Sequence, residues 1–192
     1  GQLDNTVILF SSDHGDYLGD HGLIGKGQFF EASCHVPLIA RMPGGPKGQS
    51  NRELVALADV TPTMLALAGA DVPDYMDFMP LPEIGLPRAG RDYLYGMMGG
   101  GWMCFDGRWK LCKYSTGEHM LFDLIEDPTE ERNLLNDGTC GDTYLRLDRA
   151  LTEEIMRSTI ASHHDKAVYD TDLSGDVDFG RSGWQRTYPK PL

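Results

Sequence analysis

The segment that most constrains the fold is a short apolar run near the start of the chain. Residues 6–12 read T-V-I-L-F-S-S, a run of β-branched and apolar side chains without polar alternation. Such runs are typical of strands buried on both faces in a parallel sheet. Parallel neighbours need crossover connections, and only five residues precede this run. We therefore expect an α/β fold whose other central strands come from sequence outside this chain.

Further elements follow in the first half of the chain. Residues 35–41, H-V-P-L-I-A-R, indicate a second buried strand, and a short helix is expected at 27–33. A longer helix is expected at 59–68, where Pro62 suits the first turn. Residues 72–91 are rich in Pro and Gly, which indicates irregular chain.

From Tyr93 onward the chain consists of short apolar runs separated by turn residues. Asp106-Gly107 is a strong hairpin signal between two of these runs. We therefore expect a small antiparallel sheet over residues 93–124. Apolar residues near helical spacing predict a helix at about 142–161, packed beside that sheet.

Composition limits the partners. The 192 residues carry a formal net charge of -12, so nucleic acid and anionic membrane surfaces would repel the chain. A local cation can still bind an anionic substrate at short range. No apolar run approaches the roughly 20 residues of a membrane span. The four cysteines show no C-x-x-C spacing and are expected to be buried thiols, although Cys104 and Cys112 could form one local bridge.

The segment with most chemical content directly follows the first predicted strand. Residues 12–26 read S-D-H-G-D-Y-L-G-D-H-G-L-I-G-K, and ligands of open α/β sheets bind beyond the carboxyl ends of strands. Because neighbouring strand side chains point to opposite faces, Asp13 and His14 can share a ligand only if the strand ends there, and Gly15 suits that turn. A carboxylate with an imidazole favours a divalent cation such as manganese, magnesium or calcium. Two ligands leave such a site incomplete, so the others come from outside sequence, substrate or water.

The polar residues of this segment also have ordinary structural explanations. Asp-His-Gly alone is a common turn. We expect Asp16 and Asp20 to be solvated loop acids and His21 to be a structural, hydrogen-bonding histidine rather than a third ligand. Lys26, taken alone, is a surface lysine.

Two stretches together resemble the sulfatase family of the alkaline phosphatase superfamily. The first is residues 6–41, almost without a gap. The second is residues 105–135, F-D-G-R-W-K-L-C-K-Y and then H-M-L-F-D-L-I-E-D-P-T-E-E-R-N-L-L. It is similar to the family's C-terminal signature, a hairpin followed by leucine-tyrosine-aspartate-leucine and an acidic-aspartate-proline segment, with Phe122 where tyrosine is usual. Two separate motifs in the same order as in the family argue against a chance match.

The resemblance implies both a fold and roles for three residues. The fold would be part of an alkaline-phosphatase-like mixed sheet with helices, followed by a small C-terminal antiparallel sheet and helix. Asp13 and His14 would be metal ligands, most often to calcium, with magnesium or manganese as alternatives. Lys26 would be a catalytic and substrate-binding residue that contacts the sulfate oxygens of a sulfate ester and neutralises charge on the leaving group.

The chain departs from the family at the nucleophile. Sulfatases attack with a formylglycine made from cysteine in a C-x-P/A-S-R motif, and none of the four cysteines lies in one. The family's N-terminal aspartate pair is also absent. We therefore interpret the chain as the last part of a sulfatase-like protein, inactive alone, whose partner is the missing N-terminal part carrying the formylglycine. If it follows most bacterial relatives, the protein is periplasmic or secreted.

Domain boundaries and competing functions follow from the resemblance. Residues 1–92 would end the catalytic α/β domain, 93–165 would form the small sheet with its helix, and 166–192 an extended tail. The leading function is sulfuric ester hydrolysis. A phosphonate monoester or phosphodiester hydrolase of the same superfamily is the nearest alternative, because the same aspartate, histidine and lysine suit it. A non-catalytic sulfatase-like module is the third reading.

Overall fold

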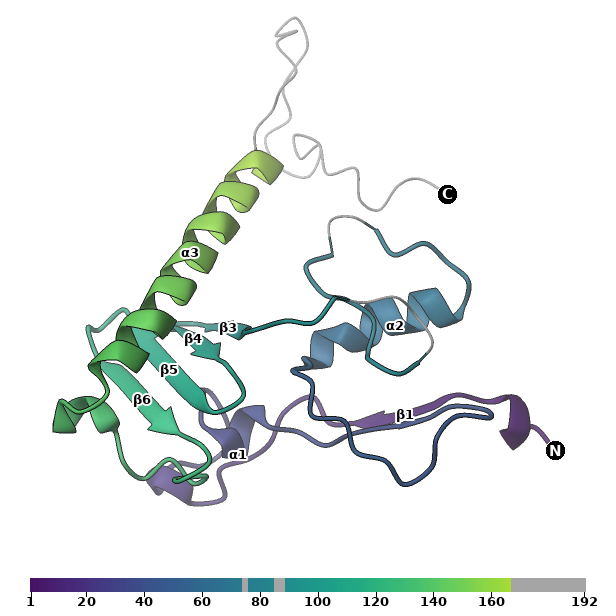
Figure 1. Ribbon diagram of the computed structural model, residues 1–192, viewed down its shortest axis with the longest axis horizontal. Helices are drawn as coiled ribbons and strands as arrows, with labels where there is room; N and C mark the ends of the chain where they lie inside the picture. Colours follow the sequence, from purple (N-terminus) through teal and green to yellow (C-terminus); the bar gives the residue numbers. More distant parts are fainter. Residues whose placement is uncertain (74–75, 85–88, 167–192) are drawn as a thin grey trace, which may run out of the picture. The chain divides into compact units, whose positions relative to one another are not determined.

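The computed structural model describes residues 1–73, 76–84 and 89–166, and within them it shows a mixed α/β fold (Figure 1). The chain divides into two compact units, Gly1–Asp148 and Arg149–Leu192. Almost all of the expected tail, residues 167–192, lies outside the described residues. No helix in the described ranges has the length and apolar character needed to cross a membrane.

The first two strands form a separate ribbon. β1 (Ile8–Ser11) pairs antiparallel with β2 (Leu38–Arg41). The expectation of parallel strands buried on both faces is therefore wrong for this chain, since Phe10 is 59% exposed and Ile39 is 61% exposed. Burial of both faces requires additional strands and covering layers, which a two-stranded ribbon lacks.

A four-stranded antiparallel sheet makes up the second half of the first unit. Its strands, in both chain order and spatial order, are β3 (Leu94–Met98), β4 (Gly101–Phe105), β5 (Trp109–Tyr114) and β6 (His119–Asp123). The turn at Asp106-Gly107 joins β4 to β5, and the Asp106 carboxylate accepts hydrogen bonds from the backbone N–H groups of Arg108 and Trp109. Gly107 has a φ of 95°, a value that favours glycine. The predicted sheet and hairpin are confirmed.

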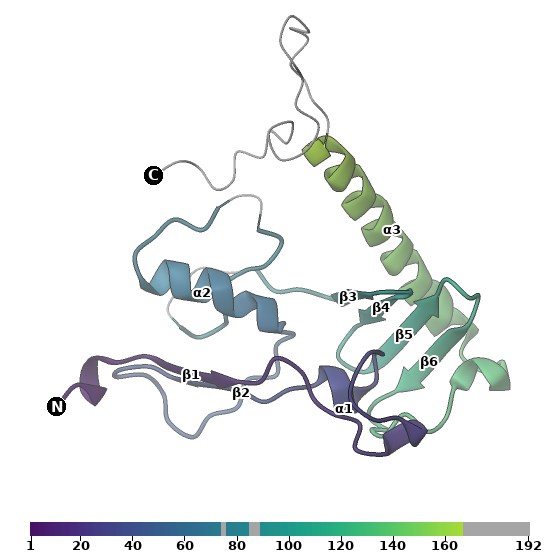
Figure 2. The same cartoon turned by 180° about the vertical axis from the view of Figure 1, so that it is seen from behind.

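The first turns of a long helix attach to this sheet (Figure 2). The helix α3 spans Gly141–Lys166, so the helix expected at 142–161 is confirmed. Within the first unit, Lys113 Nζ of β5 lies 2.5 Å from Asp148 Oδ1 and Arg146 lies 2.6 Å from Asp106. The sheet and the first turns of α3 contain six completely or almost completely buried side chains: Cys104, Leu111, Cys112, Leu121, Phe122 and Leu147.

Two shorter helices lie earlier in the chain. α1 covers only Glu31–Cys34, shorter than the helix expected at 27–33, because Gly27 has a φ of 131° and Phe30 is extended. α2 covers Val60–Leu67 and confirms the helix expected at 59–68. The structure also contains 3-10 turns at Leu3–Asn5, Asp20–Gly22, Leu57–Asp59 and Leu134–Asp137.

Candidate functional site

A closed loop between β1 and α1 carries the three residues with predicted roles. The backbone N–H of Tyr17 donates to the carbonyl of Gly25 at 2.8 Å, and that of Gly19 donates to Leu23 at 2.9 Å. These bonds join the two arms of the loop. Lys26 therefore returns to the point at which the chain left β1.

Side chains within the loop fix its shape. Asp16 Oδ1 accepts hydrogen bonds from the backbone N–H groups of Leu18 at 2.9 Å and Gly25 at 3.2 Å, so Asp16 orders the loop rather than only facing solvent. Tyr17 is 2% exposed, and its phenol oxygen accepts from the backbone N–H of Gln28. Sequence reasoning assigned neither role. A single aromatic residue within a Gly- and Asp-rich loop was the available signal for a buried anchor.

Gly15 allows this loop to touch α1. Its backbone N–H donates to the carbonyl of Ser33 at 2.9 Å. A Cβ at this position would lie 1.9 Å from the carbonyl oxygen of Ala32, which no side chain could tolerate. The glycine expected for a turn is therefore required by close backbone approach, and α1 directly supports the residue that follows His14.

The structure brings Asp13, His14 and Lys26 together. The Nζ atom of Lys26 lies 2.5 Å from Nε2 of His14, and Oδ2 of Asp13 lies 3.3 Å from the same Nε2. Nδ1 of His14 lies 2.7 Å from the carbonyl oxygen of Gly15. Because an ammonium group can only donate, Nε2 accepts and Nδ1–H donates to Gly15. This tautomer leaves the lone pair of His14 on the side that faces Asp13 and Lys26.

Asp13 is ionised in this setting. Desolvation acts to raise the pKa of its carboxyl, but the charge of His14 whenever its ring is protonated, the backbone N–H of His14 and the Lys26 ammonium outweigh it and hold that pKa below its ordinary value. The Asp13 side chain is 82% exposed. An accessible carboxylate beside an imidazole lone pair is a suitable pair of ligands for a divalent cation.

The same donor set is incomplete for such an ion. Calcium, for example, takes about six to eight oxygen ligands. Over the described ranges, no cluster of three or more His, Cys, Asp or Glu side chains is placed to hold a metal. The two residues therefore fit a metal only as part of a larger ligand set.

His21 packs inside the loop. Its ring stacks on Phe30 with centroids 3.8 Å apart and an interplanar angle of 10°. This contact agrees with the structural role expected for His21. Phe30 belongs to an apolar cluster with Tyr17 and Phe122, and Phe122 is 2% exposed. A side chain without a hydroxyl is well suited to that environment.

No cysteine of the chain lies in the motif that yields formylglycine. All four are free thiols, so the local bridge considered for Cys104 and Cys112 is not formed. Both are buried as expected, and burial raises the pKa of each thiol to about 12. Cys34 is exposed and Cys140 is partly exposed, so the expectation of buried thiols is wrong for these two. With no C-x-P/A-S-R context around any of them, the residues of this chain do not fit a formylglycine.

Comparison with known proteins gives the family. The family model for sulfatases matches residues 1–70. An arylsulfatase of Clostridium perfringens is 34% identical over 166 residues, which is 81% of this chain and 34% of the arylsulfatase. A solved structure of a protein bound to its substrate, D-glucosamine-2-N,6-O-disulfate, matches 80% of this chain and 35% of its own with a TM-score of 0.73 and 27% identity. The phosphonate monoester hydrolase of Agrobacterium radiobacter matches 85% of this chain and 36% of its own with a TM-score of 0.66 and 31% identity.

These findings define the class of protein. The chain belongs to the sulfatase family of the alkaline phosphatase superfamily. Its fold is that of its sulfatase neighbours. The chain spans about a third of the length of the curated relatives it matches.

Proposed function

We propose that this chain supplies part of the metal and sulfate site of a sulfuric ester hydrolase. In this proposal Asp13 and His14 bind a divalent cation, calcium in the first instance, and Lys26 binds the sulfate oxygens. The observation that carries the proposal is the meeting of these three side chains on one closed loop, with Nε2 of His14 within 3.3 Å of both charged groups. They belong to a chain of the sulfatase family.

The chemistry of sulfate esters suits these groups. Negative charge develops on the bridging oxygen as the S–O bond breaks, and prepositioned positive groups stabilise it. The Lys26 ammonium would supply one such group beside the sulfate. A bound cation would supply Lewis-acid stabilisation. The Nδ1–H bond to Gly15 would keep the His14 lone pair directed at the cation.

The remainder of the site is proposed to come from the N-terminal part of a longer protein. That part would contribute the formylglycine nucleophile and the missing metal ligands. This chain contains neither the C-x-P/A-S-R motif nor the family's N-terminal aspartate pair. The exposed apolar side chains of the β1–β2 ribbon support this, because Ile8, Phe10 and Ile39 are 43%, 59% and 61% exposed. Contiguous exposed apolar surface marks a site of association.

Phosphonate monoester or phosphodiester hydrolysis is the second candidate. The similarity to the phosphonate monoester hydrolase favours it, since the identity of 31% to that enzyme exceeds the 27% to the disulfate-bound structure, although the TM-score of 0.66 is below 0.73. A metal and an ammonium group stabilise phosphoryl and sulfuryl oxygens by the same electrostatics. Loop geometry alone therefore does not select between the two esters.

Rates measured side by side test the proposal. The longer protein that contains this chain should be assayed on an aryl sulfate, a phosphonate monoester and a phosphodiester. We expect the sulfate ester to have the highest kcat/KM, and Lys26→Ala to lower it. A higher kcat/KM for a phosphorus ester selects the second candidate, and no turnover of any ester supports the non-catalytic reading.

A further inference from the structure

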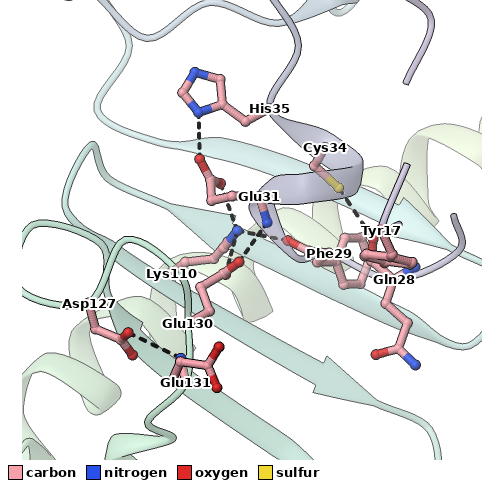
Figure 3. Close-up of polar contacts among 10 residues, drawn as sticks. All are labelled: Tyr17, Gln28, Phe29, Glu31, Cys34, His35, Lys110, Asp127, Glu130 and Glu131. Carbon is pink, nitrogen blue, oxygen red and sulfur yellow. Dashed lines mark hydrogen bonds and ion pairs between the residues drawn. The ribbon is translucent and has the colours of Figure 1, made fainter. Parts of the chain in front are cut away.

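A buried lysine on the C-terminal sheet has no place in the proposed chemistry. Lys110 of β5 is 1% exposed. Its Nζ lies 2.7 Å from each of three oxygens, Oε1 of Glu31, Oε1 of Glu130 and the carbonyl oxygen of Phe29 (Figure 3). The ammonium donates hydrogen bonds to Phe29 and Glu31 and forms an ion pair with Glu130. We call Lys110, Glu31 and Glu130 the lysine triad, in which Lys110 and Glu130 are buried and Glu31 is partly exposed.

The triad joins the two stretches that resemble the family. Glu31 begins α1 in the first stretch, whereas Lys110 and Glu130 belong to the second. Oε2 of Glu130 also accepts the backbone N–H of Glu31 at 2.6 Å. Glu130 holds a φ of 59°, unusual for a residue other than glycine, and its backbone N–H donates to Asp127. The aspartate-proline signature therefore forms a rigid turn that presents a carboxylate to α1.

Stability alone does not explain such a triad. Burial acts to lower the pKa of Lys110, but the charges of Glu130 and Glu31 outweigh it and raise that pKa, so the lysine is charged. The desolvation cost of buried ion pairs is often so large that apolar replacements are neutral or stabilising. A buried pair does, however, specify one relative position of the elements it joins, because only that position satisfies both charges.

The triad holds α1, and α1 in turn supports the loop that carries His14 and Lys26. The carbonyl oxygen of Ser33 in α1 accepts a hydrogen bond from the backbone N–H of Gly15, the residue that follows His14. Before α1, Gln28 donates to the Tyr17 phenol, which closes the loop that carries Lys26. Through Phe29 and Glu31, Lys110 therefore fixes the same short segment to which both His14 and Lys26 are attached.

We propose that Lys110 is a positioning residue, which holds α1 where His14 and Lys26 meet and does not itself touch the ester. In this way the small C-terminal sheet sets the geometry of the site. The inference rests on the proposed function for its consequence in catalysis. Its structural content, a coupling from Lys110 to the loop, is testable without any substrate.

The first experiment uses the 192-residue chain and amide NMR spectra. Lys110→Met keeps the length of the side chain and removes the charge. We expect it to shift the backbone amide signals of Gly15 and Lys26 while those of Ile8 in the ribbon stay in place. Lys113→Met is the matched control, since it removes the neighbouring lysine of β5 and its ion pair with Asp148, and should leave both site amides unchanged.

The outcomes separate positioning from a general loss of structure. Unchanged Gly15 and Lys26 signals in a folded Lys110→Met chain overturn the inference. If that variant does not fold, Glu130→Gln decides, because it keeps the shape and the acceptor for the Glu31 N–H while it removes one charge. The same two signals should then move by a smaller amount, and their constancy also overturns the inference.

A second experiment links the coupling to the reaction. In the longer protein, Lys110→Met should lower kcat by roughly 100-fold, the loss that a misplacement of about 1 Å produces, with a smaller change in KM. Lys113→Met should change neither constant. If the wild type hydrolyses no ester, the proposed function fails while the amide signals still decide the inference. Shifted amides with an unchanged kcat would overturn the positioning role.

Discussion

The β1–β2 ribbon and the β3–β6 sheet depend on their surroundings in opposite ways. The ribbon consists of two strands with exposed Phe10 and Ile39, whereas the sheet buries Leu111 and Leu121 completely. The sheet is a meander in which each strand pairs with the next one along the chain. Its strand-to-strand hydrogen bonds are thus made from local sequence, whereas its Phe122 packs against Tyr17 and Phe30.

Under the proposed function, this difference separates the proposed ligands from the part of the chain that supports them. The ribbon leads into the loop that carries Asp13, His14 and Lys26, so the chemical groups lie on the part that is least complete. The sheet contributes no proposed ligand, yet its Lys110 contacts the segment that supports that loop. The sheet thus supports the loop that carries the proposed ligands.

Activity gives the largest expected contrast. The 192-residue chain should show no turnover of an aryl sulfate above the buffer background, with or without calcium, because no sequence motif places a nucleophile beside the proposed metal ligands Asp13 and His14. Lys26 alone should bind sulfate only weakly. The purified chain and its Lys26→Ala variant should be assayed together. Turnover that disappears in the variant would mean that this chain contains its own nucleophile.

Core substitutions test the contrast in stability. Leu121→Ala should lower the free energy of unfolding by about 2–5 kcal/mol, because Leu121 is 0% exposed in the sheet. Phe10→Ala should change it by less than about 0.5 kcal/mol, the usual range for an exposed position. Urea denaturation of both variants measures the two values. Equal losses would show that the ribbon is as well packed as the sheet.

The sheet was predictable from sequence because its signals are local. The turn at Asp106-Gly107 and the alternating runs around it specify a hairpin without reference to distant residues. The run at residues 6–12 predicts a strand equally well, but an apolar run carries no information on strand direction. Within the described residues it pairs with β2, and that pairing is antiparallel.

The site was predictable only in part. The resemblance identified Asp13, His14 and Lys26, and the structure brings them together. Lys110 and Glu31, 79 positions apart, could not be paired from one sequence, because a lysine within an apolar strand has many possible partners. Pairing over such a separation is a property of the folded chain.

Metal affinity should depend on Asp13 and His14, which follow β1, and not on His21, which lies further along the loop. In the longer protein, Asp13→Ala and His14→Ala should each weaken calcium binding by at least about tenfold, the lower end of losses seen even for residues one shell further out. His21→Ala should keep the affinity, because His21 is stacked on Phe30. A calcium titration of the three variants measures this. Loss of metal in His21→Ala with retention in Asp13→Ala would reverse the ligand assignment.

The smallest effect concerns the pH dependence of the sheet. Arg108 donates to both carboxylate oxygens of Asp123, and this hydrogen bonding, against the opposing effect of burial, holds the pKa of Asp123 below its ordinary value of 3.8. A carboxyl whose pKa is lower in the folded state stabilises the fold above its unfolded value, and this contribution is lost as the pH falls through the folded value. Stability should therefore decline as the pH falls below about 4, and Asp123→Asn should reduce that decline. Urea denaturation of wild type and variant between about pH 6 and pH 3 measures it. Identical pH profiles would show that the Arg108–Asp123 pair contributes nothing measurable to the stability of the sheet.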